Sequence, residues 1–309
     1  MIGYIARRVL FAIVLVFAVS SASMLLARLA PGDFVTSRLG PGARRDQVDA
    51  ERARYGLNRS FGEQYRQWLA GAVHLDFGRS MQYERPVSEL IPGYAWNTGL
   101  LAITALVVAT LIGLPMGVVT GTRRHGVVPA AIRGVSLVLL SMPPLLTSLF
   151  LVFIAARSGW LPAGGMTSSS GGDLLSHMVV PVAALALPLA AMFERLQSQA
   201  MAETIGQPYV IATFSRGVPI SRVIWRAALK NALRPIASIY GLVVGTLLSG
   251  SFAVEVVTAW PGLGQLMLGA LRSRDIYLVA GCAAAGSIFL AAGTLISDAA
   301  LAIVDPRSR

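Results

Sequence analysis

Long uncharged stretches alternate with short polar ones along the whole chain of 309 residues. A helix needs roughly 20 apolar residues to cross the hydrocarbon layer of a bilayer. The sequence therefore predicts an all-α, polytopic membrane protein with six transmembrane helices. The uncharged stretches that predict these spans are 9–27, 98–122, 134–156, 174–193, 235–254 and 276–297.

The composition supports this interpretation. Hydrophobic residues make up 55% of the chain and charged residues only 13%, whereas soluble domains average about 25% charged residues. The stretch 9–27 follows Arg7 and Arg8 and is longer than the roughly 7 to 15 apolar residues of a secretory signal peptide. We therefore expect it to remain in the protein as the first transmembrane helix.

The distribution of basic residues predicts the topology. The net charge of +11 could indicate nucleic-acid binding, but Arg and Lys gather in the connections on one side of the predicted bundle, at 7–8, 123–133, 195–234 and 307–309. Short loops rich in Arg and Lys stay in the cytoplasm. We expect a multi-pass protein of the cell membrane with both termini cytoplasmic, surrounded by membrane lipid and binding no nucleic acid.

The same topology predicts how the chain is organised. Residues 1–30 form the first transmembrane helix, 31–97 a long extracytoplasmic loop, and 98–309 a core of five helices that includes a cytoplasmic segment at 201–235. The long loop carries nine Arg against eight Asp and Glu. Its charge is nearly balanced, and loops longer than about 60 residues contribute little to orientation.

The loop 31–97 is predicted to contain two short helices. The segment 41–57 is typical of a helix that ends with Gly56 in the left-handed conformation. In the second helix, residues 61, 65, 68 and 69 are apolar and lie on one face. This face indicates either an outer scoop that meets a partner or gates the pathway, or an amphipathic helix at the lipid headgroups.

Small residues and prolines interrupt the predicted spans. Gly113, Gly117 and Gly121 repeat every four residues and form a face on which another helix can pack closely, within this bundle or on a second membrane chain. Pro143 and Pro144 remove two backbone donors from the stretch 134–156, so we expect a kink there.

Ionisable residues in the membrane zone are candidates for function. The spans predicted above place three of them near their ends, where structural roles are favoured: Glu255, Asp298 and His177. A proton-coupled carrier would be expected to bury a carboxylate nearer the middle of a span. The predicted spans contain no such carboxylate.

The sequence lacks the common catalytic and metal-binding motifs. H-E-x-x-H, C-x-x-C and G-x-S-x-G do not occur, and Cys282 is the single cysteine. The single lysine, Lys230, lies in A-L-K-N, so the chain has no G-K-[ST] loop for ATP. We expect no cofactor, no metal and no enzymatic activity, and any uphill transport must draw on an ion gradient or another protein.

The segment 209–235 is the most basic part between two long apolar stretches. It predicts a helix over 209–216 that ends at Gly217, followed by Pro219 in the first turn of a second helix. In this second helix a basic residue recurs every four positions, at 222, 226, 230 and 234. Anionic lipid would hold such a stripe at about 1 kcal/mol per cation, whereas the sharp corner indicates a knob presented to a soluble partner.

This segment resembles the cytoplasmic E-A-A loop of ABC importer permeases, whose fixed positions fall on Ile211, Ala212, Thr213 and Gly217. Ile211 replaces the acidic residue of that pattern and Thr213 its second Ala. The dipeptide/oligopeptide branch of these permeases is the closer match. Its other motifs follow in order along the chain: YIARRVL (4–10), APGD (30–33), YGL (55–57), QYRQWL (64–69), LDFGRS (75–80), PVSELI (86–91), WLPAGG (160–165), ALKNALRP (228–235), VEVVTAWPGLGQL (254–266), RDIYLV (274–279) and DPRSR (305–309).

The resemblance implies the transmembrane permease subunit of an ATP-driven importer for di- or oligopeptides. Its implied partners are a second homologous permease subunit, two ABC ATPase subunits and an extracytoplasmic solute-binding protein. Nickel, glutathione and oligosaccharide permeases belong to the same branch. The residues implied to couple the chain to an ATPase are Ala212, Thr213, Arg216, Gly217, Val218, Pro219 and Ile220.

Two other classes of function remain as alternatives. A self-sufficient secondary carrier or channel for a small solute would need no ATPase partner, and the corner at Gly217 favours the importer over it. An intramembrane enzyme would need a nucleophile or metal constellation, and the motifs for these do not occur in the sequence.

Overall fold

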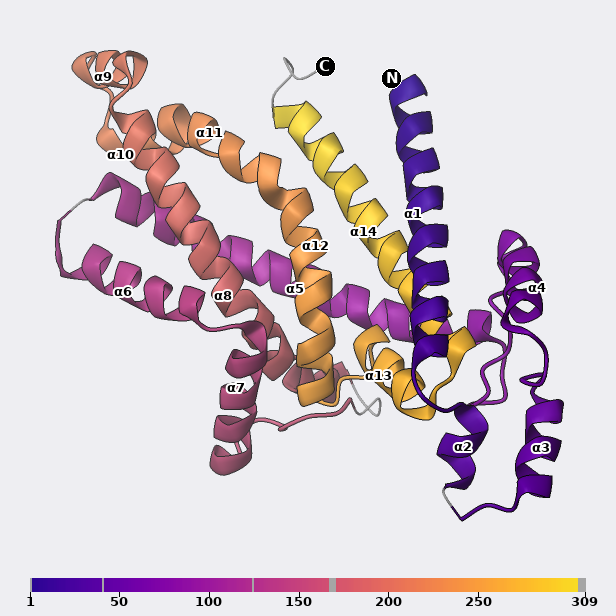
Figure 1. Cartoon of the computed structure of the whole chain (residues 1–309). Coiled ribbons are helices and arrows are strands. Elements are labelled where there is room, and N and C mark those ends of the chain that lie inside the picture. Colours follow the sequence, from indigo (N-terminus) through magenta and orange to yellow (C-terminus); the bar gives the residue numbers. More distant parts are fainter. Residues whose placement is uncertain (1, 41, 124, 167–170, 305–309) are drawn as a thin grey trace. The chain divides into compact units, whose positions relative to one another are not determined.

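The computed structural model describes residues 2–40, 42–123, 125–166 and 171–304. Within these ranges the regular structure is helical, apart from one isolated bridge between Arg79 and Pro86, so the all-α prediction is confirmed. The chain forms two compact units, Met1–Thr98 with Pro261–Ala291 and Gly99–Trp260 with Ala292–Arg309. Figure 1 labels their helices.

The first unit is built around a small apolar core. Trp68, Met24, Phe34 and Met81 are buried together in it. Two long helices, α5 (Val87–Thr122) and α14 (Ile276–Val304), begin in this unit and end in the other. The helices that lie wholly in the first unit are α1 (Ile2–Leu29), α2 (Phe34–Leu39), α3 (Arg45–Arg54), α4 (Phe61–Val73) and α13 (Leu263–Ser273).

Helix α2 begins with a capping box that also carries an ion pair. The Asp33 carboxylate accepts from the Thr36 amide at 2.9 Å, and Arg52 Nε donates to its other oxygen at 2.7 Å. Burial raises the pKa of Asp33, but the hydrogen bonds from Thr36 and Arg52 outweigh it and hold the pKa below its usual value. Asp33 thereby joins the start of α2 to α3.

The two helices predicted in the long loop are confirmed as α3 and α4. After α3 the Leu57 amide donates to the Arg52 carbonyl at 2.9 Å, and Gly56 has φ +67°, the left-handed closure that the sequence indicates. The apolar face of α4 buries Trp68, and the hydroxyl of Tyr65 donates to Ser21 of α1 at 3.0 Å. This face therefore packs, at least in part, within its own unit.

A buried carboxylate fastens the turn 80–83 to the start of α14. Asp275 is fully buried and accepts from the Ser80 hydroxyl at 2.6 Å, from the Gln82 amide at 3.1 Å and from the Leu278 amide at 3.1 Å. Three donors compensate for the loss of hydration. Sequence reasoning did not single out Asp275, because its partner Ser80 lies 195 positions away.

The second unit packs α5 against α8 through small residues. A side chain added at Gly113 would come within 2.5 Å of the Ala190 carbonyl, and one at Gly117 within 2.5 Å of Gln197 Cβ. The predicted glycine face therefore serves packing inside this chain. The other helices of this unit are α6 (Val127–Ser141), α7 (Pro144–Ser158), α8 (Gly171–Ile205), α9 (Pro208–Ser215), α10 (Ile220–Arg222), the π-helix η1 (Val223–Ala228), α11 (Leu229–Ala232) and α12 (Arg234–Val257).

Among the described residues, four helices are long and apolar enough to cross a membrane, and up to six spans result if each of two bent pairs counts as one. The predicted third span is a pair, α6 and α7, bent by 106° where Pro143 and Pro144 stand. The sequence predicts only a kink in one helix. Pro143 and Pro144 both lack a backbone N–H, so α6 ends before them and α7 begins at Pro144.

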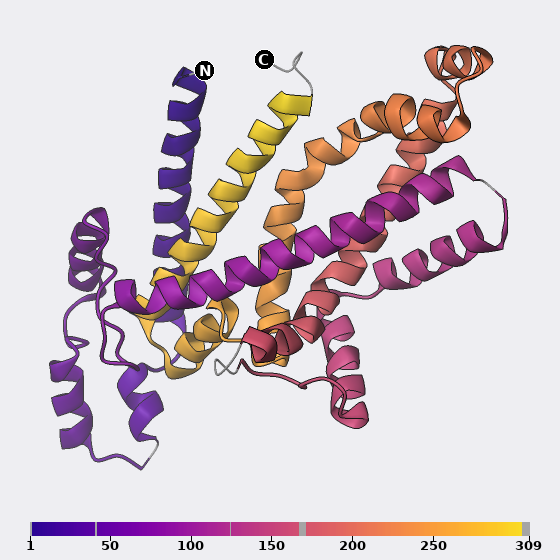
Figure 2. The ribbon, with the colours of Figure 1, turned by 180° about the vertical axis from the view of Figure 1, so that it is seen from behind.

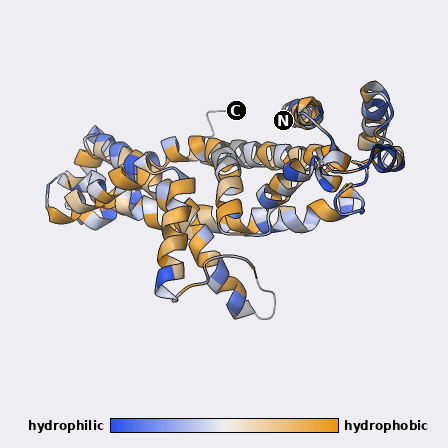
Figure 3. Cartoon of the chain, turned by 60° about the horizontal axis from the view of Figure 1, so that its bottom comes forward, coloured by the Kyte–Doolittle hydropathy of each residue, from blue (hydrophilic) through white to orange (hydrophobic). Residues whose placement is uncertain are grey.

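The predicted fifth span, α12, is bent by 52° between Arg234–Gly245 and Gly250–Val257. Coloured by hydropathy, the long helices are mostly apolar, and hydrophilic residues gather in short helices and turns (Figure 3). Residues 305–309 and the side chain of Asp298 lie outside what the structure describes.

Candidate partner-docking surface

The segment between α8 and α12 folds back on the end of α8. Helix α8 stops at Ile205, and Gln207, with extended backbone, caps α9. Pro208 takes the first position of α9, where its missing N–H removes no hydrogen bond. Figures 1 and 2 show α9 and α10 together beyond the end of α8.

A sharp corner joins α9 to α10, as the sequence predicts. Gly217 has φ +78°, and its amide donates to the Phe214 carbonyl at 3.0 Å. Only glycine adopts this backbone conformation without strain. Pro219 is the N-cap of α10 and precedes its first turn, one position earlier than predicted. Its extended ψ of 136° lets its carbonyl accept the first amides of the new helix, from Arg222 and Val223.

Apolar side chains anchor the corner to α8. Val210 of α9 and Val223 of η1 are each 4% exposed and pack in one cluster with Met201 of α8. Ala228 and Ala232 complete the buried face. The cluster packs the residues on both sides of the corner against the end of α8.

Other side chains of the corner face outward. Ile211, Phe214 and Ile220 are 54%, 55% and 63% exposed. An exposed apolar surface of this kind can meet either a protein partner or lipid. The remaining residues implied by the resemblance lie on the same corner: Ala212, Arg216, Gly217 and Pro219 are exposed, and Thr213 and Val218 are half-buried.

Hydrogen bonds close the segment into a loop. Asn231 Nδ2 of α11 donates to the Tyr209 hydroxyl of α9 at 2.5 Å. The Thr213 hydroxyl donates to the Tyr209 carbonyl at 2.7 Å, one helical turn earlier. Tyr209 therefore connects α9 to the helix that leads directly into α12.

The basic stripe lies on a helix that is not uniformly α-helical. Residues 223–228 form a π-helix, and the sequence predicts a plain α-helix there. The buried positions Val223, Ala228 and Ala232 are spaced by five and then four residues, as this wider turn requires. An α-helical spacing would turn position 228 away from the cluster. The four basic residues of the stripe, Arg222, Arg226, Lys230 and Arg234, are all exposed.

The chain matches two family descriptions end to end. Residues 113–309 match the binding-protein-dependent transport system inner membrane component, and residues 1–108 match the N-terminal part of such membrane components. The chain belongs to this family. It is therefore a multi-pass inner-membrane component of a binding-protein-dependent transport system.

Curated relatives of this inner-membrane component match along their whole length. The oligopeptide transport system permease protein AppB of Bacillus subtilis is 32% identical over 99% of both chains. A putative peptide permease protein of Brucella suis is 31% identical over the same shares. The glutathione transport system permease protein GsiC of Shigella flexneri is 28% identical over 100% of this chain and 99% of its own.

The inner-membrane component also buries a carboxylate inside a long helix. Glu194 of α8 is 2% exposed and accepts from the Thr120 hydroxyl at 2.6 Å. Nearby, Gln197 is fully buried, and neither of its polar atoms has a partner among the described residues. Sequence reasoning ended the fourth span at Phe193 and missed Glu194, although no Gly or Pro lies between Phe193 and Gly206.

Two of the other ionisable candidates lie near the ends of long helices, as the sequence predicts. Glu255 is fully buried near the end of α12, and the His177 ring lies 2.7 Å from the Asp173 carbonyl one turn earlier in α8. Within the described part of the chain no three His, Cys, Asp or Glu side chains are grouped to hold a metal ion. The strongest candidate for function is therefore the corner around Gly217.

Proposed function

We propose that this chain is the membrane-spanning permease subunit of an ATP-driven importer for peptides. The family fixes the class of transport system, and the similarity to oligopeptide and peptide permeases supports the substrate class. Glutathione, the substrate named for a third relative, is itself a short peptide. A second homologous permease subunit, two ATPase subunits and an extracytoplasmic binding protein complete the assembly.

The observation that carries the proposal is the exposed corner on a fixed base. Ile211, Phe214 and Ile220 are exposed on α9 and α10, while Val210 of α9 and Val223, directly after α10, are buried against α8. A basic helix that only lies on the lipid surface does not require a sharp corner of this kind. An apolar knob of this kind fits a groove on a soluble protein, and we assign that groove to the ATPase.

The charge of the segment indicates what the groove looks like. Residues 204–254 contain no Asp or Glu, and Arg216, Arg222 and Arg226 of the same segment are exposed. A complementary partner presents an apolar groove with acidic residues on its rim. The chain has no P-loop lysine of its own, so ATP hydrolysis belongs to that partner.

Movement of the corner reaches two long helices. The apolar cluster ties α9 to α8, and the hydrogen bond from Asn231 to Tyr209 ties it to the segment leading into α12. Closure of the ATPase would therefore displace α8 and α12 together as rigid elements. In this mechanism the corner residues transmit force and do not touch the peptide.

The proposed topology places the corner and both termini in the cytoplasm and residues 31–97 outside. The basic residues of the segment 195–234 support this orientation, because short cytoplasmic connections are rich in Arg and Lys. The extracytoplasmic loop then faces the binding protein, and the corner faces the ATPase.

A self-sufficient carrier or channel is the second candidate. Glu194 favours it, because a buried carboxylate within a long helix suits proton coupling. The two candidates differ in their need for an ATPase. We would purify the tagged chain in mild detergent, identify the copurifying proteins by mass spectrometry, and measure ATP-dependent peptide uptake by the reconstituted complex. An ATPase in the complex and uptake that requires ATP support the importer, whereas uptake by this chain alone refutes it.

A further inference from the structure

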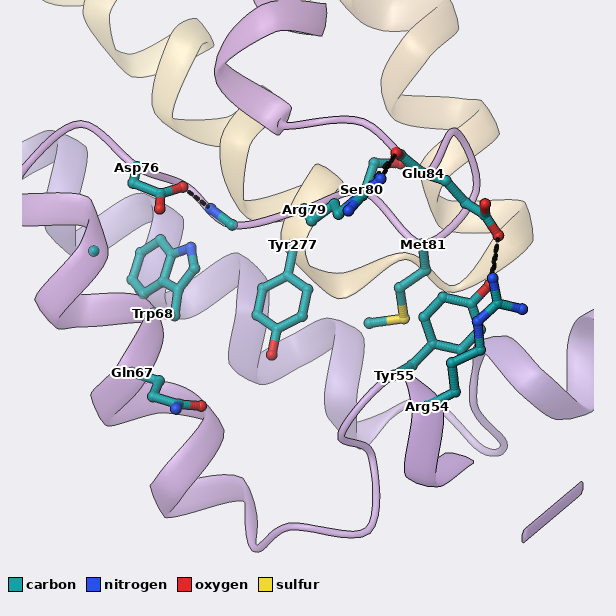
Figure 4. A pocket seen from close by; sticks show the side chains of 12 residues that line it. Arg54, Tyr55, Gln67, Trp68, Asp76, Arg79, Ser80, Met81, Glu84 and Tyr277 are labelled. Carbon is teal, nitrogen blue, oxygen red and sulfur yellow. Dashed lines mark hydrogen bonds and ion pairs between the residues drawn. The ribbon is translucent and has the colours of Figure 1, made fainter. Parts of the chain in front are cut away.

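A cavity of about 430 Å³ lies within the first unit, in the segment 31–97 and its contacts. Its walls come from the end of α3, one side of α4, the turn 76–84 and the first turn of α14, and Figure 4 shows their side chains. The cavity falls in the range of about 300–1,000 Å³ that is typical of small-molecule sites. The docking surface described above does not use it.

One end of the cavity is built around the Glu84 carboxylate. The Tyr55 hydroxyl donates to Glu84 Oε1 at 3.0 Å, and Arg54 Nη2 lies 3.5 Å from the same oxygen. Arg38 Nη1 donates to the Tyr55 hydroxyl at 2.9 Å. Two guanidinium groups and a phenol thus converge on one carboxylate.

A third guanidinium group stands beside them. Arg79 donates to the Glu84 carbonyl through Nε at 2.8 Å and through Nη2 at 2.6 Å. Glu51 lies 3.6 Å from Arg54 Nη1 and adds a second carboxylate. Three guanidinium groups against two carboxylates leave one positive charge in excess. This end therefore suits a carboxylate, which guanidinium groups bind through paired hydrogen bonds.

The opposite end is acidic. Asp76 lies away from Arg54 in Figure 4, with Trp68 and Tyr277 between them. Its Oδ1 accepts from the Gly78 amide at 2.9 Å, and among the described residues it forms no ion pair. The exposed carboxylate is open to a cationic group of a ligand.

Aromatic side chains line the space between the ends. Trp68 is buried, and its indole N–H has no hydrogen-bond partner among the described residues. A buried donor without a partner is uncommon in folded proteins. Gly78 has φ +89°, and a side chain there would come within 3.3 Å of the Tyr277 ring. The backbone thereby leaves the aromatic wall uncovered.

We propose that this cavity binds a short zwitterionic peptide. The peptide carboxylate lies at Arg54 and Arg79, its ammonium group at Asp76, and an apolar side chain against Trp68 and Tyr277. The inference rests on the proposed function, because a peptide on its way into the cell reaches the segment 31–97 before it reaches the membrane.

The first test uses the unaltered chain in its purified complex without the binding protein. Isothermal titration calorimetry would compare alanyl-phenylalanyl-alanine with its N-acetylated form and its C-amidated form. We expect each modification to weaken binding about tenfold, since each removes a charge-assisted hydrogen bond. Equal affinities for all three peptides would overturn the proposal.

The second test locates the two contacts. Asp76→Asn should abolish the preference for the free amine and leave the affinity for the N-acetylated peptide unchanged. Arg54→Gln should abolish the preference for the free acid and leave the affinity for the amidated peptide unchanged. Asp46→Asn and Arg66→Gln, at exposed positions outside the cavity, are the matched controls and keep both preferences. A merely structural role would weaken all three peptides alike.

The outcomes separate this proposal from the proposed function. Unchanged preferences in both cavity variants would place the peptide elsewhere and overturn it. If the unaltered chain binds no peptide and these variants no longer attach the binding protein, the cavity accepts a loop of the binding protein. That result would also overturn the proposal. ATPase copurification from the same preparations reports on the importer independently of the cavity.

Discussion

Replacing Gly217 tests the corner most sharply. Its φ of +78° is strained for other residues, but a side chain built there meets no atom within 4 Å. The folding penalty is therefore conformational, about 1–2 kcal/mol for most residues. Asn and Asp tolerate this conformation better than other residues, so Gly217→Asp should leave the chain folded and inserted.

The same substitution places a carboxylate in the docked interface. An uncompensated charge buried at an interface costs about 3 kcal/mol or more, and at 1.4 kcal/mol per tenfold this is a loss of docking affinity of roughly 100-fold. Gly217→Asn has the same size and backbone tolerance without the charge. We expect Gly217→Asp to abolish transport and Gly217→Asn to weaken it much less.

The assay is ATP-dependent peptide uptake in proteoliposomes, with capture of the ATPase by the tagged chain measured in parallel. Membrane insertion and binding of the solute-binding protein should be normal in both variants. Full transport by Gly217→Asp would refute docking at this corner. Equal loss in both variants would show that size at position 217, not charge, disturbs the interface.

Three further predictions concern other contacts. Tyr209→Phe removes the acceptor for Asn231 and should raise amide exchange in α9 as a bond of about 1 kcal/mol is lost. The pKa of Asp33 is lowered in the folded chain. The ionised Asp33 carboxylate therefore stabilises α2 fully above the unfolded pKa of about 3.9, and this stabilisation is lost as the pH falls through the lower folded pKa. Amide exchange in α2 as a function of pH measures the loss. Gly117→Ala should lower thermal stability by about 1–3 kcal/mol through overpacking against α8, whereas Gly134→Ala, with no atom within 4 Å, should not.

Each of these has a result that contradicts it. Unchanged exchange in α9 of the Tyr209→Phe variant would mean that the hydrogen bond to Asn231 does not hold the loop. An Asp33→Asn variant with the same pH profile in α2 would assign the acid sensitivity to another group. Equal thermal stabilities of the two alanine variants would argue against close packing of α5 on α8.

Local features of the fold could be predicted from the sequence because single residues determine them. The corner follows from the backbone freedom of Gly217, the end of α3 from Gly56, and the close approach of two helices from the spacing of Gly113 and Gly117. Each requires only that a residue without a side chain stand where the backbone turns or another helix approaches.

Features that depend on distant contacts could not be predicted. The apolar face of α4 is explained by its packing with α1, α2 and α14, and the role of Asp275 by donors such as Ser80. Similarly, the π-helix η1 depends on which side chains are buried against α8. The four-residue repeat of basic residues indicates a regular α-helix instead. Glu194 was missed because hydropathy places the end of a span at the first charge, whereas burial on α5 extends it.

The most direct test of the central claim is site-specific cross-linking at the corner. The only cysteine, Cys282, is buried, so a cysteine introduced by Ile220→Cys can carry a photoactivated cross-linker selectively. Ile103→Cys is the matched control, because Ile220 and Ile103 are 63% and 65% exposed. We predict that the cross-linker at position 220 captures a P-loop ATPase in native membranes and that the one at position 103 does not. Capture of lipid alone at both positions would contradict ATPase docking at this surface.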